Sequence, residues 1–297
     1  KNSVLRGVSV KIEEGKITTI MGANGCGKST LFSLMTKNLY PKKGNIFLRG
    51  KNIQNLNLKE FARQVSIVQQ YNTASDDITV ERLVSFGRTP HRKMMQSRTE
   101  EDERLTEWAM EVTGILAYRD REVARLSGGQ RQRIGIARAL ILDPKLVVCD
   151  EPVSALDVSI QAQILNLMME LQKERNLTYL FITHNLSVVK HISDDITVMY
   201  LGQMVEKAGS SEIFAHQYHP YTKALISAIP LPKYNAPDNQ IILKGEITSP
   251  INVTKSCRFA PRCVYAKPEC FENEPQLEEI EKDHFVKCHF VREINGL

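Results

Sequence analysis

The residues best suited to chemistry form one glycine-rich segment, Gly22-Ala23-Asn24-Gly25-Cys26-Gly27-Lys28-Ser29. It follows the apolar run 17–21, and from Thr30 onward apolar residues recur at helical spacing. Glycines let successive backbone N–H groups curl around phosphate oxygens, and a following helix start adds its positive dipole end. This pattern, in a strand–loop–helix context, predicts a phosphate-binding loop rather than a chance glycine turn.

Two side chains of this loop can act directly on a nucleotide. Lys28 supplies a positive charge for the β- and γ-phosphates, and the hydroxyl of Ser29 is placed to bind Mg²⁺. Cys26 is expected to be passive, although alkylation of its thiol would block the site. The loop residues predicted to contact the nucleotide are Gly22, Asn24, Gly25, Cys26, Gly27, Lys28, Ser29 and Thr30.

Three further motifs follow the loop along the chain. Asp150 and Glu151 end the apolar run 146–149, and Ser154-Ala155-Leu156-Asp157 comes directly after them. An isolated pair of carboxylates is usually a solvated strand end. Between the phosphate loop and this pair lies the pentapeptide Leu126-Ser127-Gly128-Gly129-Gln130.

That pentapeptide is the most restrictive signal in the sequence, because phosphate loops alone occur in many unrelated ATPases and GTPases. On these motifs the chain resembles the nucleotide-binding subunit of an ATP-binding-cassette (ABC) transporter over residues 1–230. Residues 231–297 resemble the C-terminal extension of one ABC subfamily.

The resemblance implies roles in hydrolysis for several side chains. Asp150 would hold Mg²⁺, commonly through water, and Glu151 would be the general base that polarises the attacking water. His184 matches the switch histidine that contacts the γ-phosphate, with a structural role as the alternative. Gln70 matches the glutamine that touches Mg²⁺ and relays the nucleotide state, with Gln69 as the alternative.

The resemblance also implies that the working ATPase is a dimer, of which this chain is one subunit. In the family, Ser127, Gly128 and Gly129 face the γ-phosphate bound to the opposite subunit, with a helix start as a second anion cradle. Gln130 and Asp157 are also expected to contact ATP. We therefore expect a second ABC ATPase subunit, identical or homologous, with two ATP molecules between the pair. Hydrolysis weakens that contact and opens the dimer.

The pattern of elements indicates the fold class. Strand-like segments at 8–12, 17–21, 46–48, 65–68, 146–149, 179–182 and 196–200 alternate with helical ones such as 160–174. This order predicts an α/β fold with a mostly parallel sheet. The resemblance makes it a P-loop NTPase (RecA-like) fold with an antiparallel β portion and a helical lobe at about 75–140. Residues 231–297 are expected to form a small, irregular, Cys-rich extension.

Composition excludes some classes of function. The net charge is +5 at pH 7 without a concentrated basic stripe, so no nucleic-acid partner is expected. No apolar run approaches the roughly 18 residues that span a bilayer, and no secretory leader is visible. The chain starts at Lys1 rather than Met, and no aromatic residue precedes Val4 to stack on adenine. We expect that an upstream segment is missing.

The end of the chain carries a second constellation. His219-Pro220-Tyr221-Thr222 resembles a hallmark of the oligopeptide/dipeptide/nickel branch, and Cys257, Cys263, Cys270 and Cys288 follow at C-x5-C, C-x6-C and C-x17-C spacing. This spacing differs from zinc fingers, in which short C-x2-C pairs dominate. The branch implies a 4Fe-4S cluster. Structural Zn²⁺ is one alternative, and thiols that are unliganded or disulfide-bonded are another. His284 and His289 are candidates for substitute ligands.

The two halves of the sequence resemble different branches. The segments 78–84 and 86–91 resemble the ferric-siderophore branch, whereas 134–140 and 153–159 resemble the peptide branch. Recombination, or a join made in sequence assembly, near the shared pentapeptide would explain this mosaic; ordinary divergence within one branch is the alternative.

We therefore interpret the chain as the ATPase subunit of an ABC importer, peripheral on the cytoplasmic side of the cell membrane. It would act with two transmembrane permease subunits and, indirectly, an extracytoplasmic solute-binding protein. Peptides are the expected solute, with a ferric chelate or nickel as the alternative. ATPases of DNA repair would need a long coiled-coil insertion after Gln70, and ribosome-acting factors would need two cassettes; only one pentapeptide is present.

Overall fold

The computed structural model describes residues 4–69, 77–93, 96–229, 240–243, 245 and 255–297. The chain divides into two compact units. Unit 1 comprises Lys1–Ile12, Ile17–Leu31 and Ile182–Leu297, and unit 2 comprises Glu13–Lys16 and Phe32–Phe181. Strand β6 (Thr178–Thr183) runs from the second unit into the first.

Unit 1 contains a sheet that is parallel at one edge and antiparallel beyond it. Strand β1 (Ile17–Met21) pairs in parallel with β7 (Asp195–Tyr200), which pairs antiparallel with β8 (Gln203–Gly209). Two C-terminal strands continue the sheet from β8, first β10 (His284–Val286) and then β9 (Glu278–Glu281). The Cys-rich extension therefore shares the sheet of the phosphate loop instead of forming a separate body.

The helices of unit 1 begin at identifiable capping residues. Asn185 caps α7 by accepting hydrogen bonds from the N–H groups of Ser187 and Val188. Pro220 occupies the first turn of α9, where its missing N–H costs nothing. The helices are α7 (Leu186–Ile192), α8 (Ser210–Ala215), α9 (Pro220–Ser227), α10 (Pro268–Glu272) and α11 (Val291–Asn295), with the short 3-10 helix Ala260–Arg262; α1 (Lys28–Met35) begins here and ends in unit 2.

Unit 2 holds two parallel strands, a short hairpin and most of the long helices. Strand β4 (Val65–Gln69) pairs with β5 (Leu146–Asp150), and β2 (Phe47–Leu48) pairs with β3 (Lys51–Asn52). The helices are α2 (Leu58–Ala62), α3 (Val80–Ser85), α4 (Glu100–Val112), α5 (Gly128–Leu140) and α6 (Val158–Arg175), with 3-10 turns at Ile53–Asn55, Phe86–His91, Leu116–Tyr118 and Val123–Arg125.

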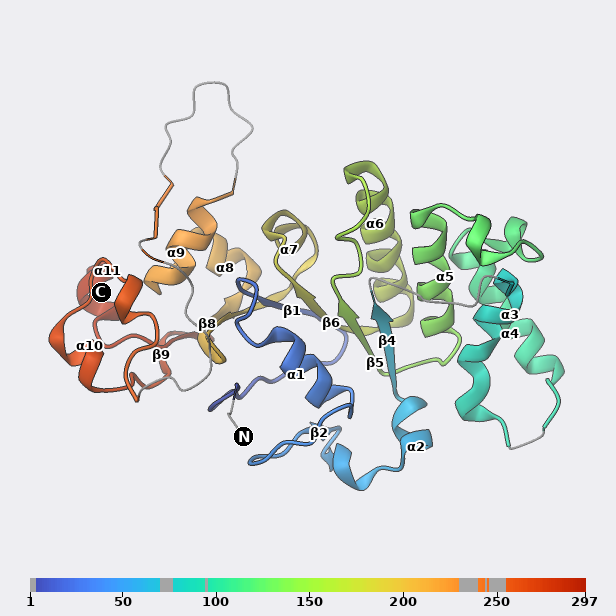
Figure 1. The fold of residues 1–297 in the computed structure, drawn as a ribbon, viewed down its shortest axis with the longest axis horizontal. Helices are drawn as coiled ribbons and strands as arrows, with labels where there is room; N and C mark the ends of the chain where they lie inside the picture. Colours follow the sequence, from blue (N-terminus) through green and yellow to red (C-terminus); the bar gives the residue numbers. More distant parts are fainter. Residues whose placement is uncertain (1–3, 70–76, 94–95, 230–239, 244, 246–254) are drawn as a thin grey trace. The chain divides into compact units, whose positions relative to one another are not determined.

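Helices α3, α4 and α5 pack on one another in the segment where a helical lobe is predicted (Figure 1). Val80, Ala109 and Ile134 supply fully buried contacts, one from each helix. Three- and four-residue spacing of apolar side chains produces this shared core. Within the described residues, no helix is both long and apolar enough to cross a bilayer.

One predicted strand is wrong. Residues 8–12 alternate between half-buried and exposed side chains, as the pattern indicates, yet no strand forms there. Alternation requires only an extended segment with two faces, whereas a strand also requires a hydrogen-bonded neighbour. The remaining predicted strands are present within one or two residues at their ends, and the predicted helix 160–174 lies inside α6.

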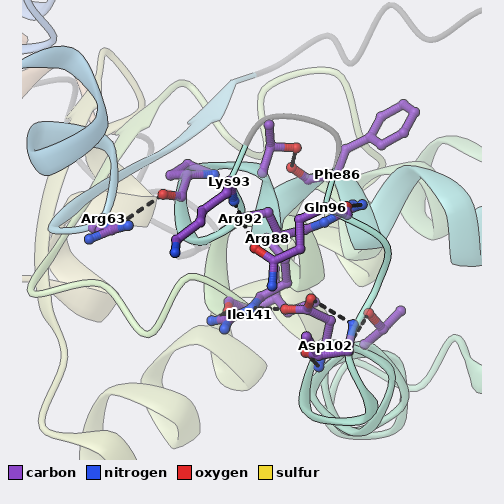
Figure 2. Close-up of polar contacts among 12 residues, drawn as sticks. Arg63, Phe86, Arg88, Arg92, Lys93, Gln96, Asp102 and Ile141 are labelled. Atoms are coloured by element: carbon purple, nitrogen blue, oxygen red, sulfur yellow. Dashed lines mark hydrogen bonds and ion pairs between the residues drawn. The ribbon is translucent and has the colours of Figure 1, made fainter.

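A buried ion pair links two elements of unit 2. The Nε of Arg88 donates to Asp102 at 2.8 Å, and the two side chains are 10% and 5% exposed (Figure 2). Arg88 also donates to the backbone oxygen of Ile141 at 3.4 Å. Burial alone would raise the pKa of Asp102, but hydrogen bonds from Arg88 and Thr99 hold that pKa below its usual value.

Replacing Asp102 by Ala leaves a buried guanidinium without its carboxylate, and we expect the free energy of unfolding to fall by ~3–5 kcal/mol. Urea denaturation of the full chain measures it. Because the folded-state pKa is lowered, the contribution of Asp102 is complete above about pH 4 and is lost as the pH falls through the folded value. Asp120→Ala is the control, since that side chain is 93% exposed. Equal stability of the two variants would contradict the prediction.

Candidate nucleotide site

The phosphate loop begins where the fully buried strand β1 ends. Gly25 and Gly27 have φ values of 78° and 105°, in the region that glycine reaches without a Cβ penalty. A Cβ on Gly22 would overlap the backbone oxygen of Met199. The sequence thus places glycine where the loop turns and where it passes close to β7.

The ammonium group of Lys28 is hydrogen bonded to backbone oxygens of the phosphate loop. Lys28 is 7% exposed, and its Nζ donates to the carbonyl oxygens of Gly22 at 2.7 Å and Ala23 at 3.1 Å. A phosphate oxygen offers this ammonium a stronger, charge-assisted partner. Helix α1 starts at Lys28, two residues before the expected Thr30, so Lys28 and Ser29 lie in its first turn.

Cys26 is a poor nucleophile in this environment. The side chain is 1% exposed, and burial raises the pKa of its thiol although Lys28 lies nearby. Alkylating agents react with the thiolate, so alkylation of Cys26 requires the loop to open first.

The acidic end of β5 has an unusual backbone. Glu151 has φ = 47°, a left-handed conformation that is uncommon outside glycine. The N–H and Oγ of Ser154 both donate to the carbonyl oxygen of Glu151, at 3.3 and 3.1 Å, which fixes the turn. The candidate base therefore sits on a strained turn, as functional side chains often do.

The register of unit 2 brings the end of β4 to the same edge. Gln69 lies opposite Asp150 in the parallel ladder, so the chain leaves β4 beside the acidic pair. The predicted glutamine, Gln70, follows immediately and lies outside the described residues.

The pentapeptide forms the start of α5. Ser127 accepts the Gln130 N–H at 3.3 Å, and Gln130 Oε1 accepts the Ser127 N–H at 2.9 Å, which completes a capping box. Ser127 and Gly128 are exposed, whereas Gly129 is buried and a Cβ there would lie 2.6 Å from Ile160. The exposed residues Ser127 and Gly128 therefore lie at the start of this helix.

Asp157 and His184 occupy element boundaries. Asp157 caps α6, and the hydrogen bond from the Ile160 N–H, then that from Ser159, lowers its pKa. His184 is exposed between β6 and α7. Unit 1 thus holds the phosphate loop and His184, and unit 2 holds the acidic pair, the pentapeptide and Asp157.

The four C-terminal cysteines gather in one region of unit 1. The Cys257 N–H donates to the Cys270 oxygen at 2.9 Å. Burial raises the pKa of Cys288 to about 12, and the charges of Cys257, Cys263 and Cys270 add to the rise, so the four thiols lie within electrostatic reach of one another. All four are free thiols. Among the described residues, no three potential ligands form a preformed metal site.

Both histidines considered as substitute ligands have other partners. His284 is buried and its Nε2 lies 2.8 Å from a carboxylate oxygen of Glu206. His289 Nε2 lies 3.0 Å from the backbone oxygen of Asn273. The cysteines are therefore the better-suited ligands: Cys257, Cys263 and Cys288 lie outside helices and strands, Cys270 lies in α10, and thiolates are ligands that iron–sulfur clusters and Zn²⁺ prefer.

One contact to the phosphate loop comes from Tyr221, which the sequence marks only as part of a branch hallmark and not as a partner of the loop. The hydroxyl of Tyr221 accepts a hydrogen bond from the Ala23 N–H at 3.0 Å, across 198 residues of chain. Only the three-dimensional pairing of β1 with β7, and the packing of α9 near it, could reveal this.

Comparison with known proteins identifies the family. The model of the ABC transporter family matches residues 5–154, and that of the oligopeptide/dipeptide transporter C-terminal region matches residues 205–270. The chain belongs to the ABC transporter family. It is a transport ATPase of that family, and the resemblance seen in the sequence is confirmed.

Two curated relatives are similar over nearly the full chain. The oligopeptide transport ATP-binding protein AppF of Bacillus subtilis is 44% identical over 291 residues, covering 95% of this chain and 88% of the relative. The dipeptide transport ATP-binding protein DppF of Haemophilus influenzae is 44% identical, covering 97% of this chain and 89% of the relative.

Solved structures confirm the fold class. The structure of cbiO1 from Clostridium perfringens, part of the ABC transporter complex cbiONQ, has a TM-score of 0.66 at 32% identity and covers 72% of this chain and 85% of that chain. The ADP conformation of MJ1267, an ATP-binding cassette, has a TM-score of 0.66 at 26% identity and covers 76% and 93%.

Proposed function

We propose that this chain hydrolyses MgATP to ADP and phosphate to drive uptake of oligopeptides or dipeptides. The carrying observation is that the relatives named for peptide transport match at 44% identity across 95% or more of the chain. The likeness therefore extends through the N-terminal half, which by itself resembles the ferric-siderophore branch. This coverage favours peptides over the alternative of a ferric chelate or nickel.

The nucleotide site divides its work among a few side chains. Lys28 and the loop N–H groups bind the β- and γ-phosphates, and Ser29 and Asp150 hold Mg²⁺. Glu151 polarises the attacking water, and His184 contacts the γ-phosphate. The remaining residues assigned to this site are Gly22, Asn24, Gly25, Cys26, Gly27, Thr30, Gln70, Ser127, Gly128, Gly129, Gln130 and Asp157.

The complete site needs a second ATPase subunit. The exposed start of α5, with Ser127 and Gly128 at its tip, supports an anion cradle offered to the nucleotide of the partner. The pair would work with two transmembrane permease subunits on the cytoplasmic side of the membrane, and a solute-binding protein on the other side would deliver the peptide.

The four cysteines complete the assignment. Cys257, Cys263, Cys270 and Cys288 would hold a 4Fe-4S cluster, with Zn²⁺ as the alternative, because four thiols follow one another at a spacing unlike a zinc finger. When bound, such a group would cross-link the four cysteine thiolates and so stiffen the extension.

Changing Glu151 to Gln should reduce phosphate release at least about 100-fold, since general-base catalysis contributes 10²–10⁴-fold. ATP should still bind, so the variant should sediment as a dimer with ATP and Mg²⁺. Lys28→Ala is the control, because without its charge the chain should lose both nucleotide and dimer. Wild-type turnover in Glu151→Gln would refute the base assignment, and a monomer under these conditions would refute the shared site.

Peptide uptake tests the solute. A strain of the source organism lacking this chain should lose uptake of labelled di- and oligopeptides and keep uptake of labelled ferric siderophore. The wild-type chain should restore uptake and the Glu151→Gln chain should not, because binding without turnover cannot drive transport. The reverse pattern, with siderophore uptake lost, would replace the proposed solute by the alternative.

Anaerobically purified protein should contain iron and acid-labile sulfide and absorb visible light. Cys263→Ser should lose this absorption, because one of four thiolate ligands is removed. Cys26→Ser is the control and should keep it, since Cys26 belongs to the phosphate loop. Stoichiometric zinc without sulfide would establish the alternative, and metal-free wild-type protein would contradict both.

A further inference from the structure

Tyr221 contacts the phosphate loop at the backbone N–H of Ala23. Its hydroxyl accepts the Ala23 N–H at 3.0 Å, and the residue is 1% exposed. Ala23 lies two residues beyond Met21, the last residue of β1, where the strand ladder has stopped. A backbone donor in such a place needs a partner, and the phenol provides it.

A second tie fixes the other side of the loop. The N–H of Gly202, in the turn between β7 and β8, donates to the carbonyl oxygen of Cys26 at 2.6 Å. Gly202 has φ = 78°, and a Cβ there would overlap the backbone oxygen of Val4. The loop is thus held at Ala23 and at Cys26, three residues apart.

The Cys-rich extension holds both ties. Phe259, between Cys257 and Cys263 in sequence, packs edge-on against Tyr200 with ring centroids 5.2 Å apart. Its ring is tilted by 56° to the ring of Tyr221, with centroids 5.5 Å apart. The neighbouring Arg258 donates to the backbone oxygen of Leu201, next to Gly202. Edge-on and tilted aromatic contacts of this kind fix ring position as well as burying area.

The start of α9 is anchored independently. His219 Nδ1 accepts the Tyr221 N–H at 3.1 Å, and its ring also hydrogen bonds the backbone of Lys287. Burial lowers the pKa of His219 to about 4, so the ring is neutral and Nδ1 stays an acceptor at pH 7. The carboxylate of Glu206 accepts the N–H groups of Tyr218 and His219 at 2.8 and 3.1 Å.

We propose that Tyr221 is a positioning residue of the ATPase. Its hydroxyl sets the entrance of the phosphate loop, and Phe259 of the extension holds the phenol in place. The affinity for MgATP therefore depends on contacts made more than 190 residues after the loop. The plain alternative is that Tyr221 only fills the core, in which case its ring matters and its hydroxyl does not.

Tyr221→Phe separates these readings, because it removes one oxygen and keeps the ring. We expect the Kd and KM for MgATP to rise about three- to tenfold, the effect of one hydrogen bond, with kcat changed less than about twofold. Tyr179→Phe is the matched control: this tyrosine is also 1% exposed, and its hydroxyl has no partner among the described residues. An unchanged Kd in Tyr221→Phe, or an equal rise in the control, overturns the proposal.

Alkylation of Cys26 gives a local readout without turnover. In nucleotide-free protein, N-ethylmaleimide should label Cys26 faster in Tyr221→Phe than in the wild type or in Tyr179→Phe, with the site identified by mass spectrometry. A looser entrance exposes this buried thiol more often. Equal labelling rates in all three proteins would contradict a role in holding the loop.

The role of the extension is tested by Phe259→Leu, with Phe271→Leu as the control because Phe271 is 55% exposed. Phe259→Leu should raise the Kd for MgATP about two- to tenfold, and the double variant with Tyr221→Phe should show less than the product of the two effects. Fully multiplicative effects would remove Phe259 from the mechanism. These titrations measure ATP alone, so a failure of the peptide assignment leaves them unaffected.

Discussion

A loop that binds phosphate must keep some backbone N–H groups unpaired while the rest of its polar backbone finds partners inside the protein. The structure meets this requirement from three directions. Lys28 donates to two loop carbonyls, Gly202 binds the oxygen of Cys26, and Tyr221 accepts from Ala23. Only when these groups are satisfied can the remaining N–H groups point outward without the loop collapsing on itself. The glycines allow the loop backbone to adopt this conformation, and the contacts from Lys28, Gly202 and Tyr221 stabilise it.

The parts of the fold that could be predicted are those that local pattern determines. The apolar run 17–21 is buried on both faces and forms β1, and the pentapeptide carries its own capping box at the start of α5. The strand predicted at residues 8–12 is absent: its side chains alternate between half-buried and exposed, but the segment does not pair with a neighbouring strand. Strands β9 and β10 were not expected, because Glu278-Glu279-Ile280-Glu281 is largely exposed and lacks the apolar alternation of a half-buried strand. Pairing between distant segments is information that no local window contains.

The same limit applies to the candidate site. Glycine, lysine and paired carboxylates identify themselves by type and spacing, because phosphate and Mg²⁺ leave few alternatives. Tyr221 supports the loop with an ordinary core side chain, and its role depends on a contact across 198 residues. Glu151 lies between these cases. Its residue type marks it as a base, but its left-handed backbone, φ = 47°, becomes visible only in the structure. That strain has to be repaid by surrounding contacts such as those from Ser154.

The two kinds of contact around Tyr221 should act on different properties of the loop. A hydrogen bond to Ala23 has a preferred direction, so it determines where the loop entrance lies. Ring packing by Phe259 lacks that sharp directionality, so it determines how narrowly the phenol is confined. Loss of the hydrogen bond to Ala23 removes the loop position that binds ATP. Loss of the Phe259 packing leaves that loop position available but less populated. Since apparent affinity falls in proportion to the competent fraction, both changes weaken ATP binding, and neither touches the group that activates water.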